Sequence, residues 1–137
     1  MSTLNPYLGF RDNAREAIEF YQSVFGGELT VNTFGDFGMP VDEAESGKVM
    51  HSQLETPSGF TLMASDRPNY MELPEASNIA VSLSGPASDE AELAGYFEKL
   101  SEGGTVAVPL AKAPWGDQFG SVTDRFGIEW MVNIAGS

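Results

Sequence analysis

The chain has 137 residues, no cysteine, one histidine, and 7 Lys and Arg residues against 20 Asp and Glu residues, a formal net charge of −13. These counts exclude a disulfide framework, a thiolate zinc site and a cysteine nucleophile, and they exclude a metal site with several imidazoles from one chain. The acidic balance disfavours nucleic acid and anionic membranes as partners. With 42% hydrophobic residues, the chain can bury a core as one small domain over 1–137.

The N-terminal segment MSTLNPYLGF lacks the basic region and apolar core of a signal peptide. No stretch reaches the roughly 20 apolar residues that a membrane helix needs. We therefore expect a cytoplasmic protein that does not span a membrane.

The first half predicts a strand, a helix and three further strands. Asn13 and Glu16 have the spacing of a capping box, which places the start of the helix at Asn13. The apolar residues at helical spacing are Ala14, Ala17, Ile18, Tyr21, Val24 and Phe25. Gly26 and Gly27 end the helix. The predicted strands are 4–10, 29–34, 49–55 and 60–64, and the glycine-rich and acidic segment 35–47 is expected to be a flexible, functional loop.

A linker at 67–76, rich in proline and polar residues, separates this half from a second one with the same order of elements. Ser88 is expected to cap the second helix, because Asp89 and Glu90 follow it and suit a helix N-terminus. The predicted buried stripe is Leu93, Phe97 and Leu100, the helix ends at 103–104, and the predicted strands are 78–83, 105–110, 119–123 and 128–134.

The two halves also match in sequence. Phe20 and Phe97 are separated by the same offset as the glycine pairs 26–27 and 103–104. We therefore predict an α+β fold with two βαβββ modules, at about 1–66 and 77–137. A single module of this kind leaves one sheet face uncovered, so two modules should pair, within one chain or between chains.

Segments at 5–29, 47–54, 62–66 and 115–133 carry a family resemblance, and the last, WGDQFGSVTDRFGIEWMVN, is the most specific. The chain resembles the vicinal oxygen chelate superfamily, which includes glyoxalase I, bleomycin-resistance proteins, fosfomycin-resistance proteins and extradiol dioxygenases. Within that superfamily it is similar to the PhnB-like branch. The resemblance implies paired modules whose sheets curve into a cup, and a homodimer.

Members of the superfamily often hold a divalent metal on the first and last strands of each module. The resemblance places Asn5 and Asn78 at the two histidine positions, and Met63 and Met131 at the two acidic positions. A neutral amide oxygen and a soft thioether are poor ligands for Mg²⁺, Mn²⁺ or Zn²⁺. We therefore expect no metal and no other cofactor at this position.

The PhnB-like branch often carries a quinone-methyltransferase label. The sequence has no glycine-rich strand-to-helix loop that could hold a nucleotide cofactor, and its repeat is not a doubly wound parallel sheet. The residues themselves therefore do not support methyl transfer.

A cup floored by Met63 and Met131 would be apolar and adaptable, which suits an aromatic or acyl ligand. Asn5, Tyr7 and Asn78 could orient such a ligand by hydrogen bonds. The alternative is that both methionines, with Leu62 and Trp130, belong to a filled core.

His51 is the one side chain whose usual pKa lies near neutrality, and strand alternation places it opposite Met50. It is either a general base or hydrogen-bond partner in the cup, or a structural histidine at a dimer contact or a half-exposed strand position.

Trp115 and Asp117 form either an aromatic lid with an acceptor or base, or a hairpin in which Asp117 caps backbone N–H groups. Residues 124–127 predict a turn.

Arg11, Arg67 and Arg125 are scarce cations that would either hold a carboxylate or phosphate or form surface ion pairs. The loop acids Glu43, Glu45, Glu72 and Glu75 are expected to be solvated, and their spacing is not that of an EF-hand.

Three functions remain open from the sequence. The first is a metal-free protein that binds a small molecule in the cup, with Trp115 as a further contact. The second is a glyoxalase- or lyase-type enzyme in which His51, Asp117 or Glu129 transfers a proton. The third is a dimeric structural or interaction protein with a filled cup.

Overall fold

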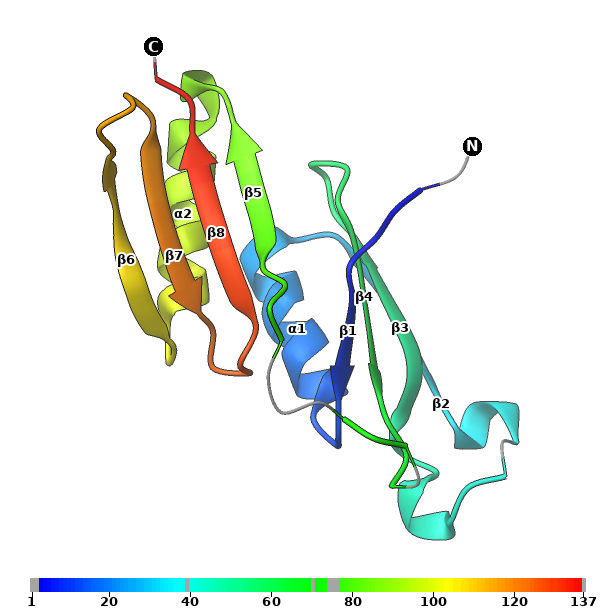
Figure 1. Cartoon of the computed structure of the whole chain (residues 1–137). Helices are drawn as coiled ribbons and strands as arrows, with labels where there is room; N and C mark the ends of the chain where they lie inside the picture. The colour runs from blue at the N-terminus through cyan, green and yellow to red at the C-terminus, as the bar shows by residue number, and fades with distance from the viewer. Residues whose placement is uncertain (1–2, 39, 70, 74–76, 137) are drawn as a thin grey trace. The chain divides into compact units, whose positions relative to one another are not determined.

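The computed structural model describes residues 3–38, 40–69, 71–73 and 77–136. The chain divides into two compact units, Met1–Glu75 and Ala76–Ser137. Each unit contains a strand, a helix and three further strands in that order (Figure 1). This order, with a mixed four-stranded sheet in each unit, confirms the predicted pair of βαβββ modules.

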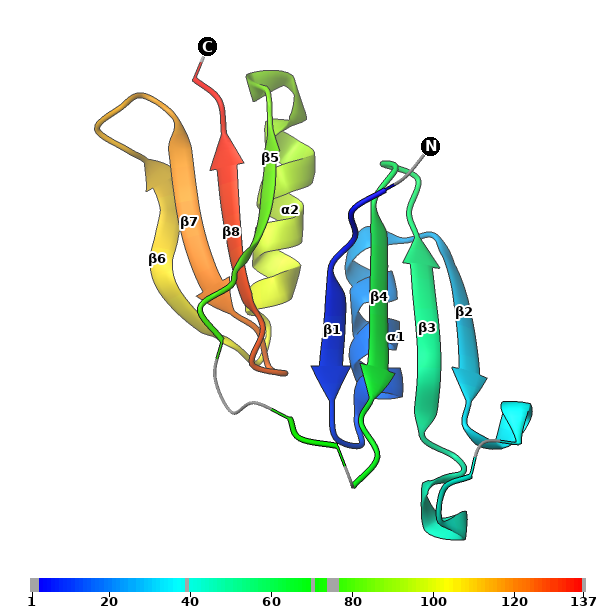
Figure 2. The same ribbon diagram turned by 45° about the vertical axis from the view of Figure 1, so that its right-hand side comes forward.

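The first unit is a four-stranded sheet with one helix on one face (Figure 2). Its elements are β1 (Tyr7–Phe10), α1 (Ala14–Phe25), β2 (Glu28–Thr33), β3 (Val49–Glu55) and β4 (Thr61–Asp66). The sheet order is β1-β4-β3-β2, in which β1 is parallel to β4 and the other pairs are antiparallel. Alternation along β4 buries Leu62, Ala64 and Asp66 under α1. The opposite side, which α1 does not cover, is called the open face of this unit.

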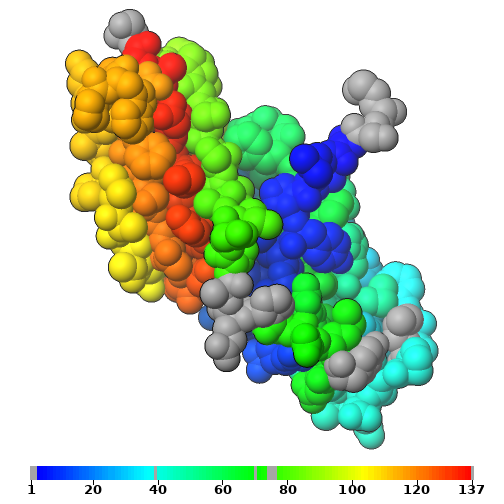
Figure 3. All heavy atoms as spheres, in the orientation of Figure 1, coloured from blue at the N-terminus to red at the C-terminus, as the bar shows by residue number. Residues whose placement is uncertain are grey.

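The second unit repeats this arrangement. Its elements are β5 (Val81–Gly85), α2 (Glu90–Ser101), β6 (Thr105–Lys112), β7 (Gln118–Thr123) and β8 (Glu129–Ile134), in the sheet order β5-β8-β7-β6. The helix α2 packs on one side of the sheet. Figure 3 shows the other side, over which no described segment of this unit lies.

Each unit has its own core between helix and sheet. In the first, Ile18, Tyr21 and Leu54 are fully buried, and all six residues of the predicted α1 stripe are buried. In the second, Leu100, Val122 and Trp130 are at most 1% exposed. The predicted stripe of α2 is confirmed, and Tyr96 joins it.

The capping of the two helices differs from the sequence prediction, although Asn13 does mark the start of α1. Asn13 lies at the N-cap of α1, but its side chain makes no capping hydrogen bond. The Oδ1 atom of Asp66 instead accepts the backbone N–H of Ala14 at 2.9 Å. Ser88 was expected to cap α2, and that prediction is wrong, because Ser88 lies inside a short 3₁₀ turn (Ala87–Asp89) and Asp89 occupies the N-cap.

The segment 35–47 is organised by short turns within its described residues. It contains 3₁₀ turns at Gly35–Phe37 and Glu43–Glu45. Backbone hydrogen bonds from Gly35 to Ser46 (2.8 Å) and from Phe34 to Lys48 (3.1 Å) draw its two ends together. No described helix is both long and apolar enough to cross a membrane.

Candidate functional site

The open face of the first unit carries a hydrogen-bonded pair of polar side chains. The Oη atom of Tyr7, on β1, lies 2.8 Å from Nδ1 of His51, on β3. Their ring centroids are 5.6 Å apart, and Tyr7 is 52% exposed. Met63 of β4 is the direct cross-strand neighbour of Tyr7. The fold therefore brings three predicted site residues, Tyr7, His51 and Met63, onto one face of one unit.

Two polar residues that sequence reasoning did not single out share this face. Asn32 of β2 is directly opposite His51, and Gln53 of β3 is directly opposite Met63. Both are half-buried. Alternation along β3 could have found Gln53, which follows His51 by two positions, whereas Asn32 depends on the register between β2 and β3.

The segment after β4 bounds this face at one end. A Cβ atom added at Gly9, the open-face residue after Tyr7, would lie 3.2 Å from Nε of Arg67 and 3.5 Å from a methyl group of Leu73. The guanidinium of Arg67 donates to the carbonyl of Glu72. Arg67 is thus a charged group that reaches the face, and it also holds the segment that borders it.

Asn5 and Asn78, the other predicted polar contacts, do not lie in strands. The first strands begin at Tyr7 and Val81, later than the sequence predicted. Asn5 is half-buried and donates to Oγ1 of Thr3 at 3.0 Å. Asn78 is exposed in the segment that precedes β5.

The second unit holds the remaining predicted residues. Met131 is half-buried on β8 opposite Ser121, and Glu129 is exposed opposite Thr123. Trp115 is 64% exposed, and its ring lies 6.0 Å from that of Phe119. This arrangement makes the Trp115 ring accessible to a ligand.

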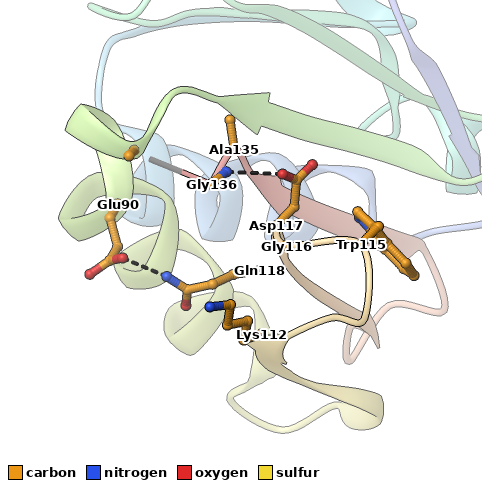
Figure 4. A pocket seen from close by; sticks show the side chains of 9 residues that line it. Glu90, Lys112, Trp115, Gly116, Asp117, Gln118, Ala135 and Gly136 are labelled. Carbon is orange, nitrogen blue, oxygen red and sulfur yellow. Dashed lines mark hydrogen bonds between the residues drawn. The ribbon is translucent and has the colours of Figure 1, made fainter.

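A pocket of about 610 Å³ opens at the end of the second unit (Figure 4). The side chains of Glu90, Lys112, Trp115, Asp117 and Gln118 line it. Two of its acidic groups already have partners, since Glu90 accepts from Gln118 and Asp117 accepts from Gly136. The pocket is therefore a polar recess whose walls are tied by internal hydrogen bonds.

Asp117 fits the structural interpretation better than the role of a base. Its Oδ1 accepts the backbone N–H of Gly136 at 2.9 Å, and its Oδ2 accepts the side-chain amide of Asn133 at 3.1 Å. The hydrogen bond from Gly136, followed by that from Asn133, holds the pKa of Asp117 below its usual value. A carboxylate stabilised in its charged form accepts a proton poorly near neutral pH.

These hydrogen bonds predict an acid-sensitive contribution to stability. Because the folded pKa of Asp117 lies below the unfolded value of 3.8, the contribution is complete above about pH 5 and is lost as pH falls through the folded pKa. Wild type should be more stable than Asp117→Asn at about pH 6, and the difference should shrink toward about pH 3. Thermal unfolding of both proteins between these two pH values measures the difference in stability. Asp12→Asn, at an exposed position, is the control; a difference that does not change with pH would contradict the assignment.

The hydrogen bonds described for Arg11, Arg67 and Arg125 go to backbone carbonyl groups. Arg11 donates to the backbone carbonyls of Arg67, Pro68 and Met71. Arg125 donates twice to the carbonyl of Glu102, at 3.1 and 3.0 Å. These arginine side chains therefore hold the backbone of loops in place in both units.

One loop acid contradicts the expectation of solvated charge. Glu45 is 4% exposed, and both of its carboxylate oxygens face the N–H of Asn69, at 3.1 and 3.3 Å. Glu43 and Glu72 are exposed, and Glu75 lies outside the described residues. Within the described residues, no group of three or more His, Asp or Glu side chains is placed to hold a metal ion.

The fold defines the class of protein first. A glyoxylase/bleomycin resistance protein/dioxygenase domain from Frankia sp. EAN1pec matches with a TM-score of 0.65 and 14% identity, covering 98% of this chain and 92% of that one. At that identity the likeness shows the fold alone. The protein has the glyoxalase-like fold of two βαβββ modules.

The family follows from the sequence comparison. The family described as 3-demethylubiquinone-9 3-methyltransferase matches residues 2–133, so the chain belongs to this PhnB-like family within the glyoxalase/bleomycin resistance/dioxygenase fold. Protein PA1353 from Pseudomonas aeruginosa has a TM-score of 0.87 and 37% identity, with both chains fully covered. Protein YjdN from Escherichia coli is 30% identical, over 96% of this chain and 94% of its own.

Proposed function

We propose that this protein binds a small apolar or aromatic molecule at the open face of its first unit, without the divalent metal of the wider superfamily. The observation that carries the proposal is the 2.8 Å contact between Tyr7 and His51 beside Met63. Ligand sites combine an apolar lining with a few polar groups in fixed positions. Met63 supplies an adaptable apolar surface, and the hydrogen-bonded pair supplies fixed polar groups.

Methyl transfer, which the family's description names, is not part of this proposal. Methyl donors of the nucleoside type are held by a glycine-rich turn between a strand and a helix in doubly wound folds. In this chain β1 passes to α1 through Arg11, Asp12 and Asn13, and the sheet of each unit is mixed rather than parallel.

The second candidate is an enzyme of the glyoxalase or lyase type, and the same pair favours it. Histidine is the commonest general acid or base, and the imidazole of His51 lies within hydrogen-bond distance of the Tyr7 hydroxyl. His51 therefore stays the first candidate for proton transfer, ahead of Asp117. Glu129, exposed on the second unit, is the remaining carboxylate candidate.

Ligand binding should raise the melting temperature of wild type, since a ligand that binds only the folded state stabilises it. The probe is 2-acetonaphthone, a neutral aromatic ketone, and the measurement is a thermal shift titration. We expect His51→Ala to weaken the apparent affinity about tenfold, the value of one hydrogen bond of about 1.4 kcal/mol. Glu19→Gln, exposed on α1, is the control and should titrate like wild type. If wild type and His51→Ala show the same apparent affinity, the ligand does not bind at this site. If no probe of this class raises the melting temperature of wild type, a structural role with a filled cup is favoured.

We also propose that the protein is a homodimer. Each module leaves one sheet face uncovered by its own helix, and apolar side chains such as Val106 (42%) and Val108 (43%) are exposed on β6. Light scattering at micromolar concentration should give twice the 14.7 kDa chain mass. A monomer mass would refute the proposal.

A further inference from the structure

The one histidine of the chain has a specific partner, and the direction of their hydrogen bond decides what the imidazole offers a ligand. Neutral histidine has one ring nitrogen that donates and one that accepts. The Oη atom of Tyr7 contacts Nδ1 of His51 at 2.8 Å, which leaves Nε2 as the ring nitrogen available to another group. The proton is on Nε2 if Tyr7 donates, and on Nδ1 if His51 donates.

The chemistry of the two groups favours donation by the phenol. A phenol O–H is a stronger hydrogen-bond donor than a neutral imidazole N–H, and the imidazole lone pair is a stronger acceptor than a phenol oxygen. The bond Tyr7 Oη–H to His51 Nδ1 therefore pairs the better donor with the better acceptor. In this arrangement the neutral imidazole carries its proton on Nε2.

We infer that Tyr7 is a positioning residue that holds His51 in the tautomer with the proton on Nε2. The ligand is then a neutral aromatic ketone or aldehyde whose carbonyl oxygen accepts a hydrogen bond from this N–H group. The inference rests on the proposed function and names its ligand class. The surrounding open-face residues Asn32, Gln53 and Met63 are uncharged, which suits a neutral ligand. The nearby cation, Arg67, is already bonded to the carbonyl of Glu72. If the protein is an enzyme, the same Nε2–H would act on the carbonyl as a hydrogen-bond donor or general acid, not as a base.

The tautomer can be tested without any ligand. Because the chain has one histidine, protein labelled with ¹⁵N-histidine gives the ring signals of a single imidazole. Long-range ¹H–¹⁵N spectra, recorded at a pH where the ring is neutral, distinguish a protonated ring nitrogen from an acceptor nitrogen. We expect Nε2 to be protonated and Nδ1 to be an acceptor in wild type. Protonated Nδ1 in wild type would overturn the inference, and this result does not depend on how any variant folds.

The variant Tyr7→Phe tests whether Tyr7 imposes this state. It removes the hydroxyl and keeps the ring, so the Nδ1 signal should move toward that of a free imidazole and the two tautomers should mix. A merely structural role of Tyr7 predicts an unchanged ring spectrum in a folded variant. An unchanged spectrum would therefore refute the positioning role.

The ligand class is tested with three naphthalene probes of similar shape: 2-acetonaphthone, 2-isopropylnaphthalene and 2-naphthoate. We expect the ketone to bind about tenfold more tightly than the hydrocarbon and to shift the His51 Nε2 signal, and we expect His51→Ala to abolish the preference. Equal binding of ketone and hydrocarbon would overturn the ligand class while leaving the proposed binding function intact. If naphthoate binds more tightly than the ketone, the ligand class is wrong and the site instead holds an anion through Arg67. Binding of none would contradict the proposed function itself.

Discussion

Replacement of Gly27 by alanine should lower the free energy of unfolding by about 2 to 5 kcal/mol, because it combines an unfavourable backbone angle with a steric clash. Gly27 has a φ of +106°, a conformation that L side chains rarely adopt. A Cβ atom there would lie 2.1 Å from the carbonyl oxygen of Glu55 and 2.8 Å from Cα of Thr56. Both contacts are with backbone, so no side-chain rotation relieves them.

Two glycines of the same unit provide matched controls for Gly27→Ala. Gly59 has a φ of +88° but nothing within 4 Å of an added Cβ, so Gly59→Ala should cost only about 1 to 2 kcal/mol. Gly47 has open space and no unfavourable φ, so Gly47→Ala should change stability by about 0.5 kcal/mol or less. Urea unfolding measures all three. If Gly27→Ala and Gly59→Ala have equal effects, the close approach to Glu55 is not a determinant of stability.

The same close approach explains why glycine pairs mark both halves of the sequence. In the second unit, a Cβ atom at Gly104 would lie 2.4 Å from the carbonyl oxygen of Thr123. Glu28 pairs with Glu55 at the start of β2, and Thr105 pairs with Thr123 at the start of β6. In each module, the glycine between the helix and the next strand thus packs directly against the backbone at the end of a neighbouring strand. The repeated glycines reflect this packing as well as helix termination.

Periodicity in the sequence was sufficient to predict the order of the elements and the faces of the helices. The apolar stripe of α1 and the strand at 49–55 correspond residue by residue to the structure. These features depend on short-range patterns, which a sequence displays directly. The starts of the first strand of each module were less accurate, because 4–6 and 78–80 are apolar or neutral but lie before β1 and β5.

Interactions between distant residues could not be predicted in the same way. The partner of His51 is Tyr7, 44 positions away, and the capping group of α1 is Asp66, 52 positions from Ala14. Asn13 and Glu16 had the local spacing of a cap, yet the tertiary partner took the N–H group. For Asp117 the sequence left two alternatives open, and its hydrogen bonds with Asn133 of β8 and with Gly136 just after that strand fit the one in which it accepts from backbone N–H groups.

Burial of charge was the feature that composition described least well. A net charge of −13 indicates a solvated acidic surface, but Glu45, Asp66 and Asp124 are each less than 5% exposed. Each accepts hydrogen bonds from backbone N–H groups, and Asp124 also accepts from Nε1 of Trp130 at 2.8 Å. Such acceptor roles explain why these carboxylates tolerate burial.

Replacement of Asp66 by alanine should destabilise the protein by about 2 to 5 kcal/mol, because two backbone N–H groups would lose their acceptor. Asp66 is 3% exposed at the end of β4. Its Oδ1 accepts from Ala14 at the start of α1, and its Oδ2 accepts from Val49 at the start of β3, both at 2.9 Å. One carboxylate therefore joins the helix and two strands of the first unit.

The variant Asp66→Asn separates the need for two acceptors from the loss of side-chain volume. Asparagine keeps the size of aspartate but has one oxygen acceptor, and its NH₂ group would face a second N–H donor. We therefore expect Asp66→Asn to be nearly as destabilising as Asp66→Ala in urea unfolding, while Asp12→Asn, exposed in the turn before α1, should change stability by about 0.5 kcal/mol or less. Wild-type stability of Asp66→Asn would show that one acceptor suffices. A large loss would show that the stability of the first module, which carries Tyr7 and His51, depends on a buried carboxylate with two acceptor oxygens.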